Sequence, residues 1–269
     1  MSIGIAVAVP DGIALAADTQ TTWNQTILRA KDKAGNSVEL AEPINVPIGW
    51  SRMARKLFEV NMNGRLYAVV TAGASHVNSK SIYATIISAA QHYSGSGTIE
   101  DVREYLAGHL KNELAQHFSC DKSQLANQPL NVCEFILATY ETDDVTKPAI
   151  ESHLVFSGKI NMKGGLNSSG HIIKWKNYEQ QIRYHGCWIG KGEFISHIVN
   201  HRNPKLPPIA GQFGMMTLAD AVDYTKFLVE FTCDFERFAV MVPDCGRPIV
   251  SATLTPDGFQ LNTFGEPGS

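Results

Sequence analysis

Residues 2–18 constrain the fold most strongly, because they form two short apolar segments joined by a turn signal. Residues 2–9 alternate isoleucine and valine with glycine and alanine, and residues 13–18 read Ile-Ala-Leu-Ala-Ala-Asp. Both faces of each segment are apolar, which is typical of strands that are covered on both sides. Pro10-Asp11-Gly12 lies between them and is a turn sequence. The chain is therefore predicted to open with a buried β-hairpin.

Strands and helices alternate in groups along the rest of the chain, which predicts the α+β class. Residues 23–52 are polar, and we expect them to be irregular. The grouping predicts one domain of four layers, with helices outside two sheets in the order αββα. Helices are expected over 77–93, from a cap at Thr98 through Leu114, over 193–199, and from Thr217 to Phe231. Strands are expected at 57–60, 65–71, 133–140, 150–156, 181–189, 248–254 and 258–262.

Charge and cysteine usage exclude several classes of protein. The net charge is −3, from 23 basic and 26 acidic residues spread along the chain, so no basic patch is expected to bind nucleic acid. The five cysteines are odd in number and form no C-x-x-C pair. They argue against a disulfide framework or a cysteine zinc site, and favour a reducing, cytoplasmic compartment. No stretch is long enough for a membrane span.

Two other patterns are better explained without a special function. The apolar N-terminus lacks the basic region of a secretory signal and is broken by Pro10-Asp11-Gly12. His197 and His201 have the i, i+4 spacing of a helix, but no glutamate follows the first as in H-E-x-x-H. A solvated helix face accounts for them, and we expect neither a metal nor a cofactor.

Ser2 is a candidate nucleophile because it directly follows the initiator methionine. Removal of Met1 would leave a free α-amine beside the serine hydroxyl. Such an amine titrates near pH 8, so part of it is neutral at pH 7 and can take the proton of its own side chain. Many proteins that are not enzymes also begin with Met-Ser, and the dipeptide alone decides nothing.

The position of Asp18 in the hairpin gives a second candidate. If the turn has three residues, Asp18 lies opposite Gly4 and diagonal to Ser2 on the same face. A two-residue turn would instead send Asp18 to the other face. An aspartate at the end of a strand can also simply cap a turn.

Several segments together resemble the proteasome β-subunits and the bacterial HslV peptidase, with their Anbu and betaproteobacterial relatives. The nucleophile strand and the Ala-x-Asp-x-x-x-Thr segment of that family are similar to Ser2-Ile-Gly-Ile and to Asp11-Gly-Ile-Ala-Leu-Ala-Ala-Asp-Thr-Gln-Thr-Thr22. Its lysine strand and oxyanion strand are similar to Arg55-Lys-Leu-Phe58 and to the segment 64–73. Two further matches are Gly190-Lys-Gly192, which resembles a Gly-Ser-Gly helix start, and the closing segment 246–258.

The resemblance implies a role for each matching residue. Ser2 would be the nucleophile, its amine the base, Lys56 the cation that tunes them, and Asp18 the residue that orients Lys56. The backbone N–H of Val70, which stands where the family has glycine, would donate to the oxyanion.

Other positions depart from the family pattern. Serine replaces the usual threonine nucleophile, Lys191 replaces one accessory serine, and Cys245 replaces another. The family aspartate near that second serine corresponds to Asp244 or Asp234. Relative to the family, insertions fall near 23–52, 157–175 and 202–216 of what we expect to be a single domain with antiparallel sheets.

The implied activity is hydrolysis of amide bonds through an acyl-enzyme on Ser2. The expected substrate is a peptide or unfolded protein, cleaved inside a homo-oligomeric ring. An ATP-dependent unfoldase would be the partner that delivers substrate to this ring. One alternative is a stand-alone amidase or acylase of the same fold. Another is a catalytically silent ring subunit, which requires Met1 to stay attached because an amide nitrogen cannot act as the base.

Overall fold

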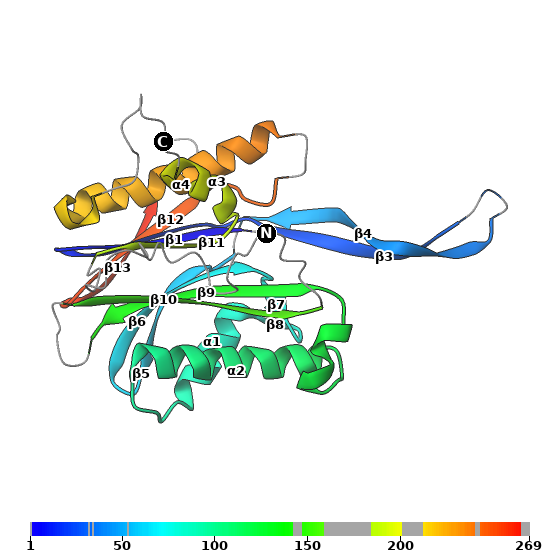
Figure 1. Ribbon diagram of the computed structural model, residues 1–269, viewed down its shortest axis with the longest axis horizontal. Helices are drawn as coiled ribbons and strands as arrows, with labels where there is room; N and C mark the ends of the chain where they lie inside the picture. Colours follow the sequence, from blue (N-terminus) through cyan, green and yellow to red (C-terminus); the bar gives the residue numbers. More distant parts are fainter. Residues whose placement is uncertain are drawn as a thin grey trace.

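The computed structural model describes residues 2–31, 33, 35–52, 54–141, 147–158, 184–200, 212–239 and 243–264. Two antiparallel sheets face each other, and helices cover the outer face of each (Figure 1). This confirms the predicted α+β class and the antiparallel sheets. No helix in the described ranges is long and apolar enough to cross a membrane.

The first sheet has five strands in the order β11-β1-β2-β12-β13, all antiparallel. Strands β1 and β2 lie inside the sheet and are buried along their whole length, because both of their faces are apolar. Segments from both ends of the sequence thus meet around the N-terminal hairpin. The five strands are β1 (Ile3–Val9), β2 (Gly12–Asp18), β11 (Gly186–Gly190), β12 (Ile249–Thr255) and β13 (Gly258–Phe264).

The second sheet has four strands in the order β10-β9-β6-β5, also antiparallel. Its inner face packs on the first sheet through small and branched residues such as Ala6, Leu15, Val70 and Ile136. The strands are β5 (Leu57–Met62), β6 (Arg65–Gly73), β9 (Asn131–Tyr140) and β10 (Pro148–Ser157), and a small ladder joins β7 (His76–Val77) to β8 (Lys80–Ser81).

Four α-helices cover the sheets in the part of the chain that the structure describes. α1 (Ile82–Gln91) and α2 (Ile99–His117) pack on the second sheet, and α4 (Leu218–Phe238) packs on the first, next to α3 (Gly192–Asn200). Side-chain caps at Thr98 and Thr217 begin α2 and α4 as predicted. α1 begins at Ile82 rather than at residue 77, and α4 continues to Phe238 rather than ending at 231. Two 3₁₀ turns are η1 (Lys122–Asn127) and η2 (Phe213–Met215).

A two-stranded arm corrects the expectation that residues 23–52 are irregular. Strands β3 (Thr21–Lys31) and β4 (Ser37–Ser51) pair as a long hairpin that projects from the body of the protein (Figure 1). Two register shifts interrupt the pairing. On β4, Ile48 and Trp50 are 65% and 56% exposed.

The other two expected insertions lie mainly outside the described residues. This holds for 159–175 of the first and for 202–211 of the second; Phe213–Met215 of the latter forms η2. The strand expected at 181–189 is described only from residue 184 and runs over 186–190 as β11. Domain number remains a prediction.

Candidate active site

The N-terminal hairpin has the shorter of the two turns that the sequence left open. Its turn has two residues, since Val9 pairs with Gly12 and Gly4 pairs with Ala17. Asp18 is therefore opposite Ile3, and not opposite Gly4 as a three-residue turn would require. Because Asp18 is the last residue of β2, its carboxylate can still reach around the end of β1, where its Oδ1 accepts a hydrogen bond from the Ile3 N–H at 3.0 Å.

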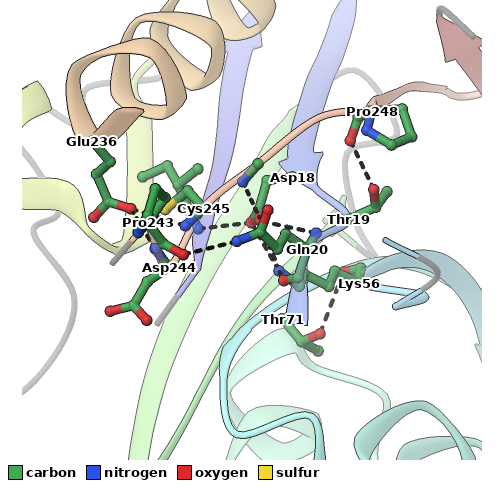
Figure 2. A network of polar contacts seen from close by, with 12 residues as sticks. Asp18, Thr19, Gln20, Lys56, Thr71, Glu236, Pro243, Asp244, Cys245 and Pro248 are labelled. Atoms are coloured by element: carbon green, nitrogen blue, oxygen red, sulfur yellow. Dashed lines mark hydrogen bonds and ion pairs between the residues drawn. The ribbon is translucent and has the colours of Figure 1, made fainter. Parts of the chain in front are cut away.

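Asp18 is held by hydrogen bonds from four other residues. Besides Ile3, the N–H groups of Gln20 and Gly246 donate to its Oδ2 at 3.1 and 3.3 Å. The Nζ of Lys56 lies 2.9 Å from each carboxylate oxygen (Figure 2). Burial raises the pKa of this carboxyl, while Lys56 and the N–H donors act in the opposite direction.

Lys56 lies directly before β5 and is almost fully buried, with 5% of its surface exposed. Its ammonium donates to Asp18 and, through a short contact, to the carbonyl oxygen of Gln20. Its backbone carbonyl accepts the N–H of Thr71 at 2.8 Å, which ties the lysine to β6. A buried cation with a buried carboxylate partner is typical of a functional site, because such a pair costs more to desolvate than it contributes to stability.

Ser2 and Lys56 line the same pocket. The cavity has a volume of about 240 Å³ and opens beside the end of β6, the start of α1 and both ends of the arm. Ser2 itself is 2% exposed. Other lining residues are Thr21, Ser51, Thr71, Gly73 and Tyr83. The structure thus brings together Ser2, Asp18 and Lys56, which come from three separate positions along the sequence.

Val70 lies in the interior of β6, and its side chain fills the space between the two sheets. A Cβ added to Gly4 would lie 2.4 Å from Cγ1 of Val70. The two sheets can therefore approach closely here only because residue 4 is glycine. The N–H of Thr71 points toward β5, where it bonds Lys56, and N–H directions alternate along a strand. The N–H of Val70 therefore points toward β9, where Val70 pairs with Ile136. Val70 is not among the residues that line the pocket.

Gly73 meets the geometric needs of an oxyanion donor better. By the same alternation its N–H points toward the β5 side, and β5 begins only at Leu57, so no described strand lies opposite Gly73 there. Gly73 lines the pocket with Ser2. Only glycine fits this position, because its φ is +85° and a Cβ would lie 2.2 Å from the carbonyl oxygen of Val132. The signal in the sequence was the glycine that ends the apolar run of β6.

β11 holds the backbone of Ser2 in place. The N–H of Lys191 donates to the Ser2 carbonyl at 2.9 Å, which continues the β1–β11 ladder by one pair. Gly190 has a φ of +79°, and a Cβ at this position would lie 1.8 Å from the Ser2 carbonyl oxygen. Only glycine allows this approach.

Gly190→Ala is expected to destabilise the protein by at least about 2 kcal/mol, because it adds a backbone clash to an unfavourable φ. Gly64→Ala is the matched control, since Gly64 has a φ of +78° with no atom within 4 Å of an added Cβ. The control should lose only about 1 kcal/mol. Denaturant unfolding measures the free energy of unfolding of both variants. Equal losses would show that the close approach of Ser2 to β11 does not contribute to stability.

The accessory candidates form a cluster on the other side of Asp18. The Nζ of Lys191 lies 3.3 Å from Oε1 of Glu236 and 3.9 Å from Oδ2 of Asp244. Burial raises the pKa of the Cys245 thiol well above its ordinary value, so it is neutral. Asp234 instead pairs with Arg247 at the surface, 3.1 Å apart. Of the two candidate aspartates, Asp244 is thus the one that lies beside Lys191.

Glu236 is a residue near the site that was not predicted from the sequence. It lies on α4, is fully buried, and its Oε2 accepts the N–H groups of Asp244 and Cys245 at 2.8 and 2.9 Å (Figure 2). Its position follows Thr225, Val229 and Thr232 at helical spacing on the buried face of α4. A carboxylate on that apolar stripe was the signal that could have revealed it.

The described residues contain no group of three His, Cys, Asp or Glu side chains placed to hold a metal. His201 lies outside them, as does the side chain of His197. The absence of a metal or cofactor remains a prediction.

Comparison with known proteins identifies the fold. No protein-family model matches the chain, and neither does the sequence of a curated protein. Among solved structures, a Gly-1 mutant of Anbu from Hyphomicrobium sp. strain MC1 matches with a TM-score of 0.52 and 11% identity, over 97% of this chain and 85% of that one. Anbu (ancestral beta-subunit) from Yersinia bercovieri matches with the same TM-score and identity, over 98% and 88%. The resemblance to proteasome β-type proteins is thus confirmed at the level of the fold.

Proposed function

We propose that the chain is an N-terminal-nucleophile hydrolase that cleaves amide bonds through an acyl-enzyme on Ser2, after Met1 has been removed. The observation that carries this proposal is that Lys56, which pairs with the buried Asp18, lines one pocket with Ser2. The fold shared with Anbu supports it. We also propose that the two sheets and their helices correspond to the αββα sandwich of such hydrolases, formed by a single domain.

In the proposed reaction, the neutral α-amine of Ser2 takes the proton from its own Oγ as that oxygen attacks the substrate carbonyl carbon. The resulting ammonium then donates the proton to the leaving amine, and the C–N bond breaks to leave an ester on Ser2. Water attacks the ester carbonyl with the same amine as base, which releases a carboxylic acid and restores Ser2. Lys56 favours the neutral amine and the developing alkoxide, and Asp18 fixes the position of Lys56.

We assign the oxyanion contact to the Gly73 N–H instead of the Val70 N–H. The oxyanion forms in the pocket beside Ser2, and Gly73 lines that pocket while Val70 does not. One well-placed donor of this kind contributes about 10²–10³ in rate.

Covalent labelling tests the proposal directly. We expect the intact mass of the purified protein to lack Met1, and an epoxyketone inhibitor to add one equivalent of mass at Ser2. Ser2→Ala keeps the fold and removes the hydroxyl, so it should not react. Labelling of Ser2→Ala at the same rate would contradict the assignment, and retention of Met1 would favour the silent-subunit alternative.

The substrate we propose is a peptide or unfolded protein, cleaved inside a homo-oligomeric ring with an ATP-dependent unfoldase as partner. Four phenylalanines on the outer face of α4 support a contact between subunits, since clustered exposed apolar residues mark interaction surfaces. Successive rings lie 6.2 and 6.4 Å apart along the first three of these residues. The four are Phe227, Phe231, Phe235 and Phe238, which are 38–81% exposed. The five free cysteines, four of them buried, support a cytoplasmic location.

Size-exclusion chromatography with light scattering tests the ring. The expected mass is several times that of the 29.5 kDa chain. Phe231→Glu, in the middle of the aromatic face, should lower that mass, whereas Lys111→Glu on α2 should not. A monomer at micromolar concentration would favour the stand-alone amidase or acylase.

A further inference from the structure

An ion pair that none of the proposed catalytic roles uses lies beside the start of β1. Lys191 follows β11, and Glu236 is in the last turn of α4; their Nζ and Oε1 atoms are 3.3 Å apart. The carboxylate of Glu236 is fully buried, and 14% of the Lys191 side chain is exposed. Among the described residues, Oε1 of Glu236 accepts no hydrogen bond. Lys191 is therefore its counterion in a region of low dielectric.

The backbone of Lys191 faces the nitrogen that would become the α-amine. Ile3 pairs with Gly190, so Ser2 is opposite Lys191, and the Lys191 N–H donates to the Ser2 carbonyl. In a hydrogen-bonded antiparallel pair, the N and O of one residue point to the same neighbour. The nitrogen of Ser2 thus points toward Lys191, while the Ile3 nitrogen points away, toward Asp18.

A second link joins Glu236 to the Asp18 end of the site. The N–H of Cys245 donates to Glu236 at 2.9 Å, and the N–H of the next residue, Gly246, donates to Asp18 at 3.3 Å (Figure 2). The two carboxylates therefore accept from consecutive backbone nitrogens. The start of β1 is thus tied to both ion pairs, since the Lys191 N–H donates to the Ser2 carbonyl and the Ile3 N–H donates to Asp18.

The other titratable groups around this end are two thiols and the carboxyl group of Glu134. Burial raises the pKa of the Cys233 and Cys245 thiols, and the carboxylates of Asp18 and Glu236 raise it further. Burial also raises the pKa of Glu134, whose Oε2 accepts the Gly190 N–H at 2.7 Å.

Asp244 is the remaining carboxylate near this end. It is 3.9 Å from Lys191, and its side chain is 22% exposed. The Lys191–Glu236 contact is shorter and its carboxylate fully buried, so that pair interacts more strongly.

We propose that Lys191 and Glu236 are positioning residues that act as a balanced pair of opposite charges to set the protonation state of the Ser2 α-amine. This inference rests on the proposed function of Ser2. A nearby cation disfavours the ammonium form and a nearby carboxylate favours it. While both are present their effects oppose each other, and the amine stays close to the ordinary titration range near pH 8. Loss of either partner should unbalance the site, in opposite directions.

The test uses Glu236→Gln, Lys191→Met and the double variant, each prepared by protease cleavage of an N-terminal fusion so that Ser2 is the first residue. In Glu236→Gln the amide oxygen of the new side chain can still accept the N–H groups of Asp244 and Cys245. Asp234→Asn is the matched control, because this carboxylate is on the same helix but pairs with Arg247 in solvent. Two readouts are used: the pH dependence of Ser2 carbamylation by cyanate, followed by mass spectrometry, and the pH dependence of kcat/KM on a peptide.

Glu236→Gln is expected to lower the amine pKa by about one unit, so that the acid limb of both profiles moves to lower pH. Lys191→Met should raise the amine pKa by a similar amount and move the limb to higher pH. The carboxylate of Glu236 still accepts the N–H groups of Asp244 and Cys245 in that variant. The double variant should return close to the native profile, and the control should not move.

Shifts of the same sign, or profiles that lose rate equally at all pH values, would overturn the inference, since a purely structural pair would act in that way. Cyanate reacts with the neutral amine whether or not the protein hydrolyses peptides. Opposite shifts in carbamylation without peptide hydrolysis would support the charge balance and refute the proposed function. Peptide hydrolysis without opposite shifts in carbamylation would support the proposed function and refute the charge balance.

Discussion

A single uncleavable residue placed before Ser2 is expected to reduce peptide hydrolysis and epoxyketone labelling by at least about a hundredfold. The base in the proposed reaction is the α-amine of Ser2, and a peptide bond at that nitrogen removes its basicity while the hydroxyl remains. Lys56 cannot take over, because its ammonium is committed to Asp18 and to the Gln20 carbonyl. Turnover of a fluorogenic peptide and the mass of the labelled protein measure the loss.

A removable extension is the matched control for this experiment. The same chain with a protease site that ends directly before Ser2 should be inert until it is cleaved, and should then reach the rate of the natural protein. Size-exclusion chromatography of both forms shows whether the fold and assembly are unchanged. If the extended protein hydrolyses peptide at the natural rate, Ser2 does not use its own amine.

Lys56→Met is expected to abolish activity and also to cost about 3–5 kcal/mol of stability. The structure buries both members of the pair, and the substitution leaves the Asp18 charge without a partner. Because burial raises the pKa of Asp18, the loss of stability should be smaller in acid and should grow as the pH rises through that pKa. Denaturant unfolding at several pH values measures it.

The double variant Lys56→Met, Asp18→Asn separates catalysis from folding. It removes both charges, so much of the lost stability should return while the activity stays absent. Lys147→Met is the surface control, since Lys147 pairs with Glu141 at the edge of β10, and it should change stability by less than about 1 kcal/mol. An active double variant would show that the charge on Lys56 has no part in the reaction.

The N-terminal hairpin shows how far the sequence predicts this site. Alternation of apolar residues located both strands, and the resemblance brought Ser2, Asp18 and Lys56 together. The register stayed open, because Pro10-Asp11-Gly12 is compatible with a turn of two or three residues, and the structure has the turn of two. The shorter turn did not separate Asp18 from the site, since a side chain at the end of a strand can reach either side of it.

Other features are only weakly marked in the sequence, because they depend on how distant segments pack together. The described core clusters contain no residue of the arm, so its strands need no alternation of apolar and polar residues. Their sequence therefore gives no sign of a strand. The position of Gly73 depends on where β5 begins relative to β6, and a local pattern does not contain that pairing. Glu236 is near the site only because α4 packs on the first sheet and the segment 243–246 donates N–H groups to both Glu236 and Asp18.

The order of strands in the first sheet has a consequence for the time at which the site can form. β1 is made before its neighbours in the sheet: its outer neighbour β11 begins at Gly186, and β12, which pairs with β2 on its other side, begins only at Ile249. The Gly246 N–H that holds Asp18 belongs to the segment just before β12. Pairings across such distances form late in folding. A chain that ends before Gly246 therefore contains Ser2 but lacks the N–H contact that holds Asp18, so the proposed site is incomplete until the segment before β12 has been made.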